Sequence, residues 1–160
     1  MSTDNPRAVA LLTRALAAEV MIATAESCTG GMVSAAITDI AGSSSIFDRG
    51  FVTYTNRAKT KMLGVSPETL AAYGAVSEET AAEMAKGAIA HSDASLAVAI
   101  TGIAGPGGSD HKPEGRVCFG IAQRDQIQTS TFEFGSLGRA NVRMCACDYA
   151  LDLLLGALDS

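Results

Sequence analysis

The chain has 160 residues, a length typical of a single domain, and 48% of them are hydrophobic, enough to bury a core without metals or disulfides. Seventeen Asp and Glu residues outnumber twelve Lys and Arg residues, which gives a formal net charge of −5. This balance argues against DNA or RNA as the main partner, because nucleic-acid binding needs a basic face. No apolar run approaches the ~18 residues of a membrane span, and the N-terminus lacks the pattern of a signal peptide.

The four cysteines show neither a C-x-x-C pair nor a histidine at a spacing typical of zinc ligands. They are Cys28, Cys118, Cys145 and Cys147. Reduced thiols in a cytoplasmic protein are the simplest interpretation, and we expect no metal site.

Turn residues and apolar spacing divide the chain into alternating helices and strands. In chain order the pattern predicts a helix over 8–18, a strand over 20–25, a helix over 32–40, a strand over 50–55, a helix over 56–63, a short helix from 67, a longer helix from 78, a strand over 94–101, strands over 116–123 and 127–134, and a helix over 137–155. Asn56, Ser66 and Ser77 are the expected N-caps of the three middle helices.

Strands separated by helices indicate parallel crossovers, whereas the closely spaced strands 116–123 and 127–134 must form an antiparallel hairpin. The sequence therefore predicts an α/β fold of three layers, α/β/α, with a mixed sheet and an antiparallel hairpin near the C-terminus. We expect residues 1–160 to form one domain, since no linker or repeat interrupts them.

Glycine-rich or polar segments follow three of the predicted strands. They are residues 26–31, residues 54–59 and residues 101–108, and the last continues as a loop to Gly115. Open α/β sheets bind ligands beyond the carboxyl ends of their strands, so these segments are expected to converge on one crevice.

The first segment is a strand-to-helix turn that could carry a nucleophile. Ser27 would be exposed there beside free backbone N–H groups at a helix start, which stabilise an anion or an oxyanion. Alternatively, Ser27 or Thr29 only caps the helix, and Gly30-Gly31 only allow close packing. Cys28 is a competing nucleophile, but a thiolate usually needs a nearby histidine, so a small buried hydrophobe is the simpler role.

The second segment places Lys59 in the first turn of the helix that follows Asn56. The helix dipole disfavours a cation there, and partial burial would lower the lysine pKa further and suit it to act as a general base. The alternative is an ordinary solvated lysine like Lys61.

The third segment holds four glycines within residues 102–108. Such a loop can point N–H groups at a phosphate, or it can be a flexible turn without a ligand. Arg139 and Arg143, four apart on the last helix, could add phosphate contacts or form a solvated edge.

Several short motifs together resemble the CinA C-terminal domain family, which contains the nicotinamide-nucleotide amidases. The motifs are Ala25-Glu26-Ser27-Cys28-Thr29-Gly30-Gly31, Tyr54-x-Asn56-x-x-Lys59, Ala75-Val76-Ser77, Ala99-Ile100-Thr101-Gly102-Ile103-Ala104-Gly105-Pro106-Gly107-Gly108 and Pro113-Glu114-Gly115-x-Val117. Each is weak alone, but their order covers about residues 7 to 155.

The resemblance implies hydrolysis of the carboxamide of nicotinamide mononucleotide to nicotinate mononucleotide and ammonia. It also implies cytoplasmic pyridine-nucleotide (NAD) salvage, no metal or organic cofactor, and a homo-oligomer. The expected partner is the small-molecule nucleotide substrate, with no nucleic acid and no membrane.

The family's nucleophile falls on Ser27 and its partner lysine on Lys59, with Tyr54 as a third catalytic residue. Substrate-binding roles are expected for Thr29, Gly30, Gly31, Asn56, Thr101, Gly102, Gly105, Gly107, Gly108 and Arg139. A different class of function stays open: a non-catalytic module that senses a nucleotide or phosphate through the same glycine turns. Release of ammonia from nicotinamide mononucleotide would separate the two.

Overall fold

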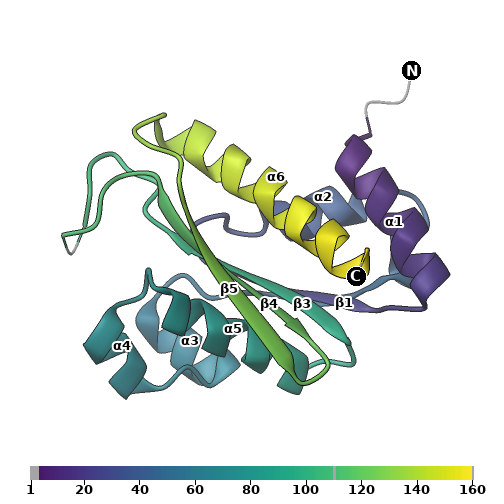
Figure 1. Cartoon of the computed structure of the whole chain (residues 1–160), viewed down its shortest axis with the longest axis horizontal. Helices are drawn as coiled ribbons and strands as arrows, with labels where there is room; N and C mark the ends of the chain where they lie inside the picture. Colours follow the sequence, from purple (N-terminus) through teal and green to yellow (C-terminus); the bar gives the residue numbers. More distant parts are fainter. Residues whose placement is uncertain (1–3, 110, 160) are drawn as a thin grey trace.

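The computed structural model describes residues 4–109 and 111–159 of the chain (Figure 1). Its elements are α1 (Pro6–Ala18), β1 (Ile22–Glu26), α2 (Met32–Thr38), η1 (Ser43–Ser45), β2 (Phe47–Val52), α3 (Asn56–Leu63), α4 (Pro67–Tyr73), α5 (Glu78–Ala90), β3 (Leu96–Gly102), β4 (Arg116–Gln123), β5 (Gln126–Glu133) and α6 (Arg139–Leu158).

The strands form one mixed sheet in the order β2-β1-β3-β4-β5. β1 pairs in parallel with both β2 and β3, whereas β4 is antiparallel to β3 and β5. Helices α1, α2 and α6 cover one face of the sheet, and α3, α4 and α5 cover the other (Figure 1). The predicted three-layer α/β fold with a C-terminal antiparallel hairpin is confirmed.

The two faces of the sheet carry side chains of different size. In β3, Leu96, Val98 and Ile100 join the core beneath α1, α2 and α6. The alternate residues Ala97 and Ala99 face the other core, which includes α3 and α5. The small side chains let α5 approach closely: a Cβ on Gly120 of β4 would lie 2.6 Å from the Ala81 carbonyl oxygen of α5.

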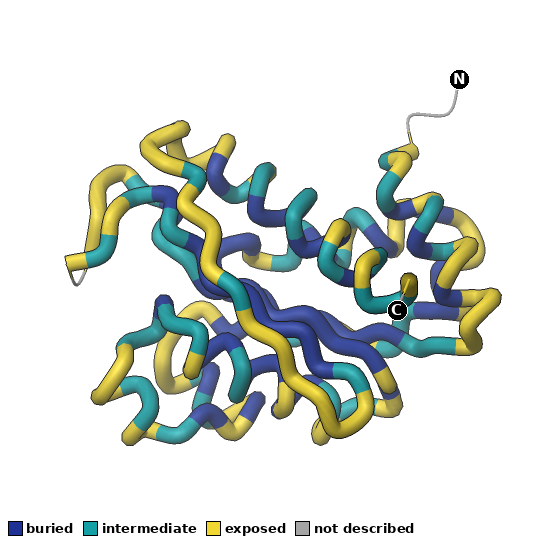
Figure 2. Tube along the Cα trace, viewed as in Figure 1, coloured by how far each residue is buried: buried dark blue, intermediate teal, exposed yellow. Residues whose placement is uncertain are grey.

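The central strands are buried, and the edge strand β5 is largely exposed (Figure 2). At the other edge, β2 begins at Phe47 rather than at residue 50 as predicted. The first residues of β2 include the charged pair Asp48-Arg49. An edge strand can carry charged residues because much of its surface meets solvent. The prediction of residues 50–55 rested on β-branched and aromatic residues, and it placed both ends too late, since the strand ends at Val52.

Local capping signals locate most helices correctly. The Ser66 and Ser77 hydroxyls accept hydrogen bonds from the Thr69 and Thr80 N–H groups, as predicted for N-caps. The predicted cap of α3 is wrong by one residue. Thr55, not Asn56, has extended backbone there, and its hydroxyl accepts from the Ala58 N–H.

Candidate active site

The carboxyl ends of β1, β2 and β3 meet at a cavity of about 320 Å³, within the usual range for small-ligand sites. The described residues that line it are Ser27, Cys28, Tyr54, Lys59, Ala75, Val76, Thr101, Gly102, Ile103, Ala104, Gly105, Pro106, Gly107, Gly108, Ser109, Lys112 and Arg139. The three segments that the sequence singled out therefore converge at one place. They do so because parallel strands end at the same edge of the sheet.

A serine and a lysine from neighbouring strand ends are hydrogen-bonded in this cavity. Ser27 directly follows β1, and Lys59 lies in the first turn of α3, which follows β2. The Lys59 Nζ lies 2.9 Å from the Ser27 Oγ. Lys59 is almost completely enclosed, with 1% of its surface exposed.

Two backbone carbonyls fix the direction of the Lys59 amine. Its Nζ donates to the Thr53 oxygen at 2.9 Å and to the Tyr54 oxygen at 3.2 Å. A carbonyl oxygen can only accept, so both bonds use N–H groups of the amine. In a neutral lysine the remaining lone pair then faces the Ser27 hydroxyl, which is the arrangement that a general base needs.

Burial lowers the pKa of Lys59 from 10.5 to about 8, because the charged form loses its hydration. Desolvation, rather than a cationic neighbour, is the dominant cause. Thus a useful fraction of the amine is neutral near pH 8. The predicted depression of the lysine pKa is present, and Lys59 differs clearly from a solvated lysine.

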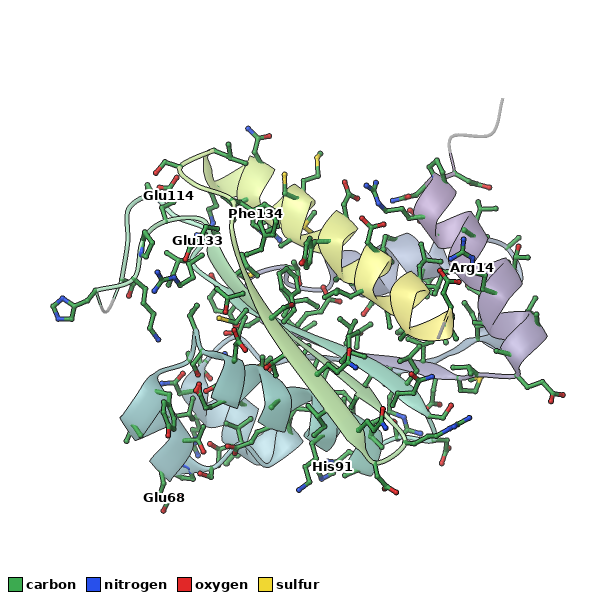
Figure 3. The ribbon with its side chains drawn as sticks, in the orientation of Figure 1. Arg14, Glu68, His91, Glu114, Glu133 and Phe134 are labelled. Atoms are coloured by element: carbon green, nitrogen blue, oxygen red, sulfur yellow. The ribbon has the colours of Figure 1, made fainter. Side chains whose placement is uncertain are left out.

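Cys28 lies beside Ser27 but is not set up as a nucleophile. Burial raises the pKa of its thiol to about 12, so the thiolate is scarce. No histidine contributes to the pKa of this thiol. His91, whose ring meets the Gly87 oxygen, lies after α5, at the opposite end of the sheet from the loop that carries Glu114 (Figure 3). The geometry favours the Ser27 hydroxyl.

The side chain of Glu26, for which the sequence suggested no role, caps the start of α2. The buried Glu26 carboxylate accepts from the N–H groups of Gly31, Val33 and Ser34, at 3.2, 2.9 and 3.0 Å. The expectation of free N–H groups at this helix start is therefore wrong for these three. An acidic residue between a buried strand and a helix was the available signal, since a carboxylate suits a helix N-terminus.

The N–H groups next to the serine are differently placed. Among the described residues, neither the Cys28 N–H nor the Thr29 N–H donates a backbone hydrogen bond to a carbonyl. These two N–H groups follow Ser27 directly in the chain. They are the nearest candidates for donors to a developing oxyanion.

The two arginines of α6 have separate roles. Arg139 lines the cavity, where its guanidinium donates to the Gly105 oxygen at 2.6 Å and to the Tyr54 hydroxyl at 2.8 Å. Arg143 instead donates to the Cys28 oxygen at 2.9 Å, on the turn that carries the serine. Arg139 therefore lies at the cavity, whereas Arg143 holds the turn that carries Ser27 and is not among the residues that line the cavity.

The glycine loop after β3 is organised by its own side chains. The Glu114 carboxylate accepts from the Gly107 N–H at 2.7 Å, so that donor is already used. Lys112 donates to the carbonyls of Tyr73 and Val76 at 2.7 and 2.5 Å, which ties the loop to the segment between α4 and α5. Some of its glycines serve packing: a Cβ on Gly105 would lie 2.5 Å from the Glu114 carboxylate.

Nine of the thirteen predicted site residues line the cavity and four do not. Thr29 is buried and donates its hydroxyl to Glu26 at 2.7 Å. Gly30 and Gly31 form the turn that leads into α2, and Asn56 is an exposed residue at the start of α3. Tyr54 lines the cavity, but its hydroxyl meets Arg139 instead of the serine–lysine pair.

Within residues 4–109 and 111–159, no three His, Cys, Asp or Glu side chains gather as a metal-ligand set. In the same part of the chain, no helix has the length and apolarity to cross a membrane.

The fold and the site define the class of protein: a three-layer α/β domain whose cavity, at the carboxyl edge of its parallel strands, holds a hydrogen-bonded serine and lysine. Comparison with known proteins agrees with the sequence motifs. The family model described as "CinA C-terminal domain" matches residues 5–158. The chain belongs to the CinA C-terminal domain family.

Similar proteins include relatives of similar length and longer ones. "Nicotinamide-nucleotide amidohydrolase PncC" of Enterobacter agglomerans is 53% identical over 133 residues, which are 82% of this chain and 80% of that protein. A "CinA-like protein" of Chloroherpeton thalassium is 55% identical over 112 residues, but this chain spans only 27% of its length. The crystal structure of competence/damage inducible protein CihA from Agrobacterium tumefaciens superposes with a TM-score of 0.90, at 46% identity and 100% coverage of both chains.

Proposed function

We propose that this protein hydrolyses the carboxamide of nicotinamide mononucleotide to nicotinate mononucleotide and ammonia. The observation that carries the proposal is the 2.9 Å contact between the Ser27 Oγ and a buried Lys59 Nζ with a lowered pKa. The choice of substrate is supported by the amidohydrolase named above, which is 53% identical over most of both chains. The geometry supports the reaction type, and the relative supports the particular amide.

An amide is a weak electrophile, so its hydrolysis needs an activated nucleophile and a proton for the departing amine. Neutral Lys59 takes the proton of Ser27 as its Oγ attacks the carboxamide carbon. The tetrahedral intermediate then collapses, the C–N bond breaks, and the lysine proton leaves with the nitrogen as ammonia. A water molecule, deprotonated in turn by Lys59, cleaves the acyl-serine ester and regenerates the serine.

The developing negative charge on the carbonyl oxygen needs donors close to Ser27. Because Glu26 occupies N–H groups of the first turn of α2, the N–H groups of Cys28 and Thr29 remain for this task. Such a donor typically contributes about a hundredfold to a thousandfold in rate.

The charge of the cavity suits an anionic substrate. Three of the described lining residues, Lys59, Lys112 and Arg139, are basic and none is acidic, although the whole chain carries a net charge of −5. A 5′-phosphate would be drawn to Lys112 and Arg139, and the backbone of the glycine loop would add N–H donors. Thr101 and Gly102 would form the wall between phosphate and serine, whereas Thr29, Gly30, Gly31 and Asn56 would act on the substrate only through the backbone or the turn.

The decisive experiment incubates the purified protein with nicotinamide mononucleotide and measures both ammonia and nicotinate mononucleotide. We expect equal amounts of the two products, and none from a matched preparation of Ser27→Ala. Tight binding of the nucleotide without ammonia from the wild-type protein would contradict the amidase and favour a nucleotide-sensing module.

The wider setting follows from the same assignment. Residues 1–160 would act as one amidase domain in cytoplasmic NAD salvage, as a homo-oligomer, without a cofactor and without nucleic acid as a partner. Sedimentation velocity on the purified chain tests the oligomer, and a monomer at working concentration would contradict it.

A further inference from the structure

Glu26 is a completely buried carboxylate that directly precedes the proposed nucleophile. It does not line the cavity. We propose that Glu26 is a positioning residue for catalysis, whose carboxylate holds the turn that aims the Ser27 hydroxyl at Lys59. The inference rests on the proposed function, because it takes Ser27 to be the reacting group.

The carboxylate is the hub of the nucleophile turn. One oxygen accepts from the Thr29 hydroxyl at 2.7 Å and from the N–H groups of Gly31 and Val33. The other accepts from the N–H and the hydroxyl of Ser34, at 3.0 and 2.8 Å. The donors lie on both the turn and the first part of α2, so a single side chain fixes the path of the chain between Ser27 and the helix.

The backbone of the same residue reaches the lysine. The Glu26 oxygen accepts from the Thr53 N–H at 2.9 Å, and the Thr53 oxygen in turn accepts from the Lys59 amine. Glu26 is also held in the sheet, where it pairs with Val52 of β2 and Ile100 of β3. The Glu26 side chain thus holds the turn that carries Ser27, and its backbone oxygen holds Thr53, whose own oxygen accepts from the Lys59 amine.

The site requires a carboxylate rather than an amide. All five hydrogen bonds that the Glu26 side chain accepts come from N–H and hydroxyl donors, and none of these donors is a Lys or Arg side chain. A glutamine would turn an NH₂ group toward at least one N–H, which leaves two donors facing each other. Both oxygens are occupied, so Glu26 does not act as a base itself.

Three variants test this role. Glu26→Gln keeps the shape of the side chain but loses part of its accepting capacity, and Thr29→Val removes only the hydroxyl donor nearest to the serine. Glu83→Gln is the matched control. Glu83 accepts from the Ser66 N–H at 2.8 Å and from the Thr69 hydroxyl at the start of α4, with the same chemistry at a helix outside the cavity lining.

We expect kcat of Glu26→Gln to fall about a hundredfold and that of Thr29→Val about tenfold, because a small misplacement of a reacting atom is costly. KM should stay within about twofold, and the pH of half-maximal kcat/KM should not move, since the lysine is unchanged. Thr29→Ser restores the hydroxyl and should restore kcat. Glu83→Gln should lower the urea concentration at the midpoint of unfolding about as much as Glu26→Gln does, but its kcat should equal that of the wild type.

Crystal structures supply a readout that does not depend on activity. Thr29→Val should show the Ser27 Oγ displaced from the Lys59 Nζ, and Thr29→Ser should show the 2.9 Å contact of the wild type. A normal kcat with an unchanged contact in folded Thr29→Val and Glu26→Gln would overturn the positioning role. Wild-type protein that releases no ammonia would instead overturn the amidase, while the crystallographic comparison would still test the role of Glu26.

Discussion

Lys59 and Lys61 stand two positions apart on the same short helix, yet only one of them can act as a base. Lys61 is exposed, whereas Lys59 is buried and its amine donates hydrogen bonds to the Thr53 and Tyr54 oxygens. The functional difference therefore comes from burial and hydrogen bonding rather than from residue type. Ser27, which alone would be an ordinary turn serine, gains its proposed role from the same contact.

Loss of either member of the pair should remove most of the turnover. We expect Ser27→Ala and Lys59→Met each to lower kcat by about a thousandfold or more, while nucleotide binding and the folded state persist. The double variant should be little worse than either single one, because the two groups act as a unit. Steady-state kinetics with ammonia detection, together with circular dichroism, make the comparison.

Cys28→Ala is the control for the pair, and its kcat should stay within about threefold of the wild type, because the buried thiol is protonated at working pH. An inactive Cys28→Ala beside an active Ser27→Ala would assign the nucleophile to the thiol.

The pH dependence follows from the lowered lysine pKa. The neutral amine is the base, so kcat/KM should rise with pH and level off above the lysine pKa of about 8. In the unfolded chain the same group titrates near 10.5. Between these values the unfolded state binds more protons, so wild-type stability should gain about 2 kcal/mol from pH 7 to pH 9.5 relative to Lys59→Met.

Urea unfolding of both proteins at the two pH values measures the stability difference. A gap between wild type and Lys59→Met that stays constant with pH would mean that Lys59 keeps an ordinary pKa in the folded protein.

At the scale of elements, the proposed binding of the substrate involves the loop between β3 and β4 and the start of α6. Arg139 joins α6 to this loop through the Gly105 oxygen, and Lys112 joins the loop to the end of α4 and to the segment that follows it. The two cations are therefore held by backbone carbonyls at the border of the cavity. Their position is set by three separate segments that meet only in the folded chain.

The phosphate prediction belongs to this loop. Nicotinamide riboside, which lacks the phosphate, should bind at least about tenfold more weakly than the mononucleotide, because it makes no charge-assisted hydrogen bonds. Lys112→Met should weaken the mononucleotide about tenfold and leave the riboside unchanged. Isothermal titration with Ser27→Ala protein measures both ligands without turnover, and equal affinities would place the phosphate elsewhere.

At the scale of the whole molecule, the cavity and the proposed catalytic pair lie at one end of the sheet, where β1, β2 and β3 have their carboxyl ends. The central strands β3 and β4 are buried on both faces (Figure 2). The four cysteines are free thiols, and three of them are buried. The proposed chemistry thus needs no disulfide to hold its groups together.

Activity should accordingly survive both a strong chelator and a reductant. We expect at least about four fifths of kcat to remain after incubation with EDTA or with dithiothreitol, because the proposed steps use only Ser27, Lys59 and backbone donors. Activity lost in EDTA and regained with one particular divalent ion would reveal a metal requirement that these groups do not explain.

The sequence by itself determined the features that depend on near neighbours in the chain. Ser66 and Ser77 predict the starts of their helices because an N-cap bonds to a residue three positions further on. The hairpin follows from the three residues that separate the predicted strands 116–123 and 127–134, although the second strand begins one residue earlier, at Gln126. The convergence of Ser27 and Lys59 could also be predicted, since both follow parallel strands that end at one edge.

Only the tertiary structure decided which polar groups are free to act. Arg139 and Arg143 are one helical turn apart in α6. Only the packing of this helix on the rest of the chain places Arg139 at the cavity and Arg143 at the Cys28 oxygen. The sequence places an acidic residue before α2, but only the packing of β1 beside the helix shows that the Glu26 carboxylate accepts from the helix N–H groups. The protonation of Lys59 depends on its burial beneath segments from across the chain, and no local pattern of residues specifies that burial.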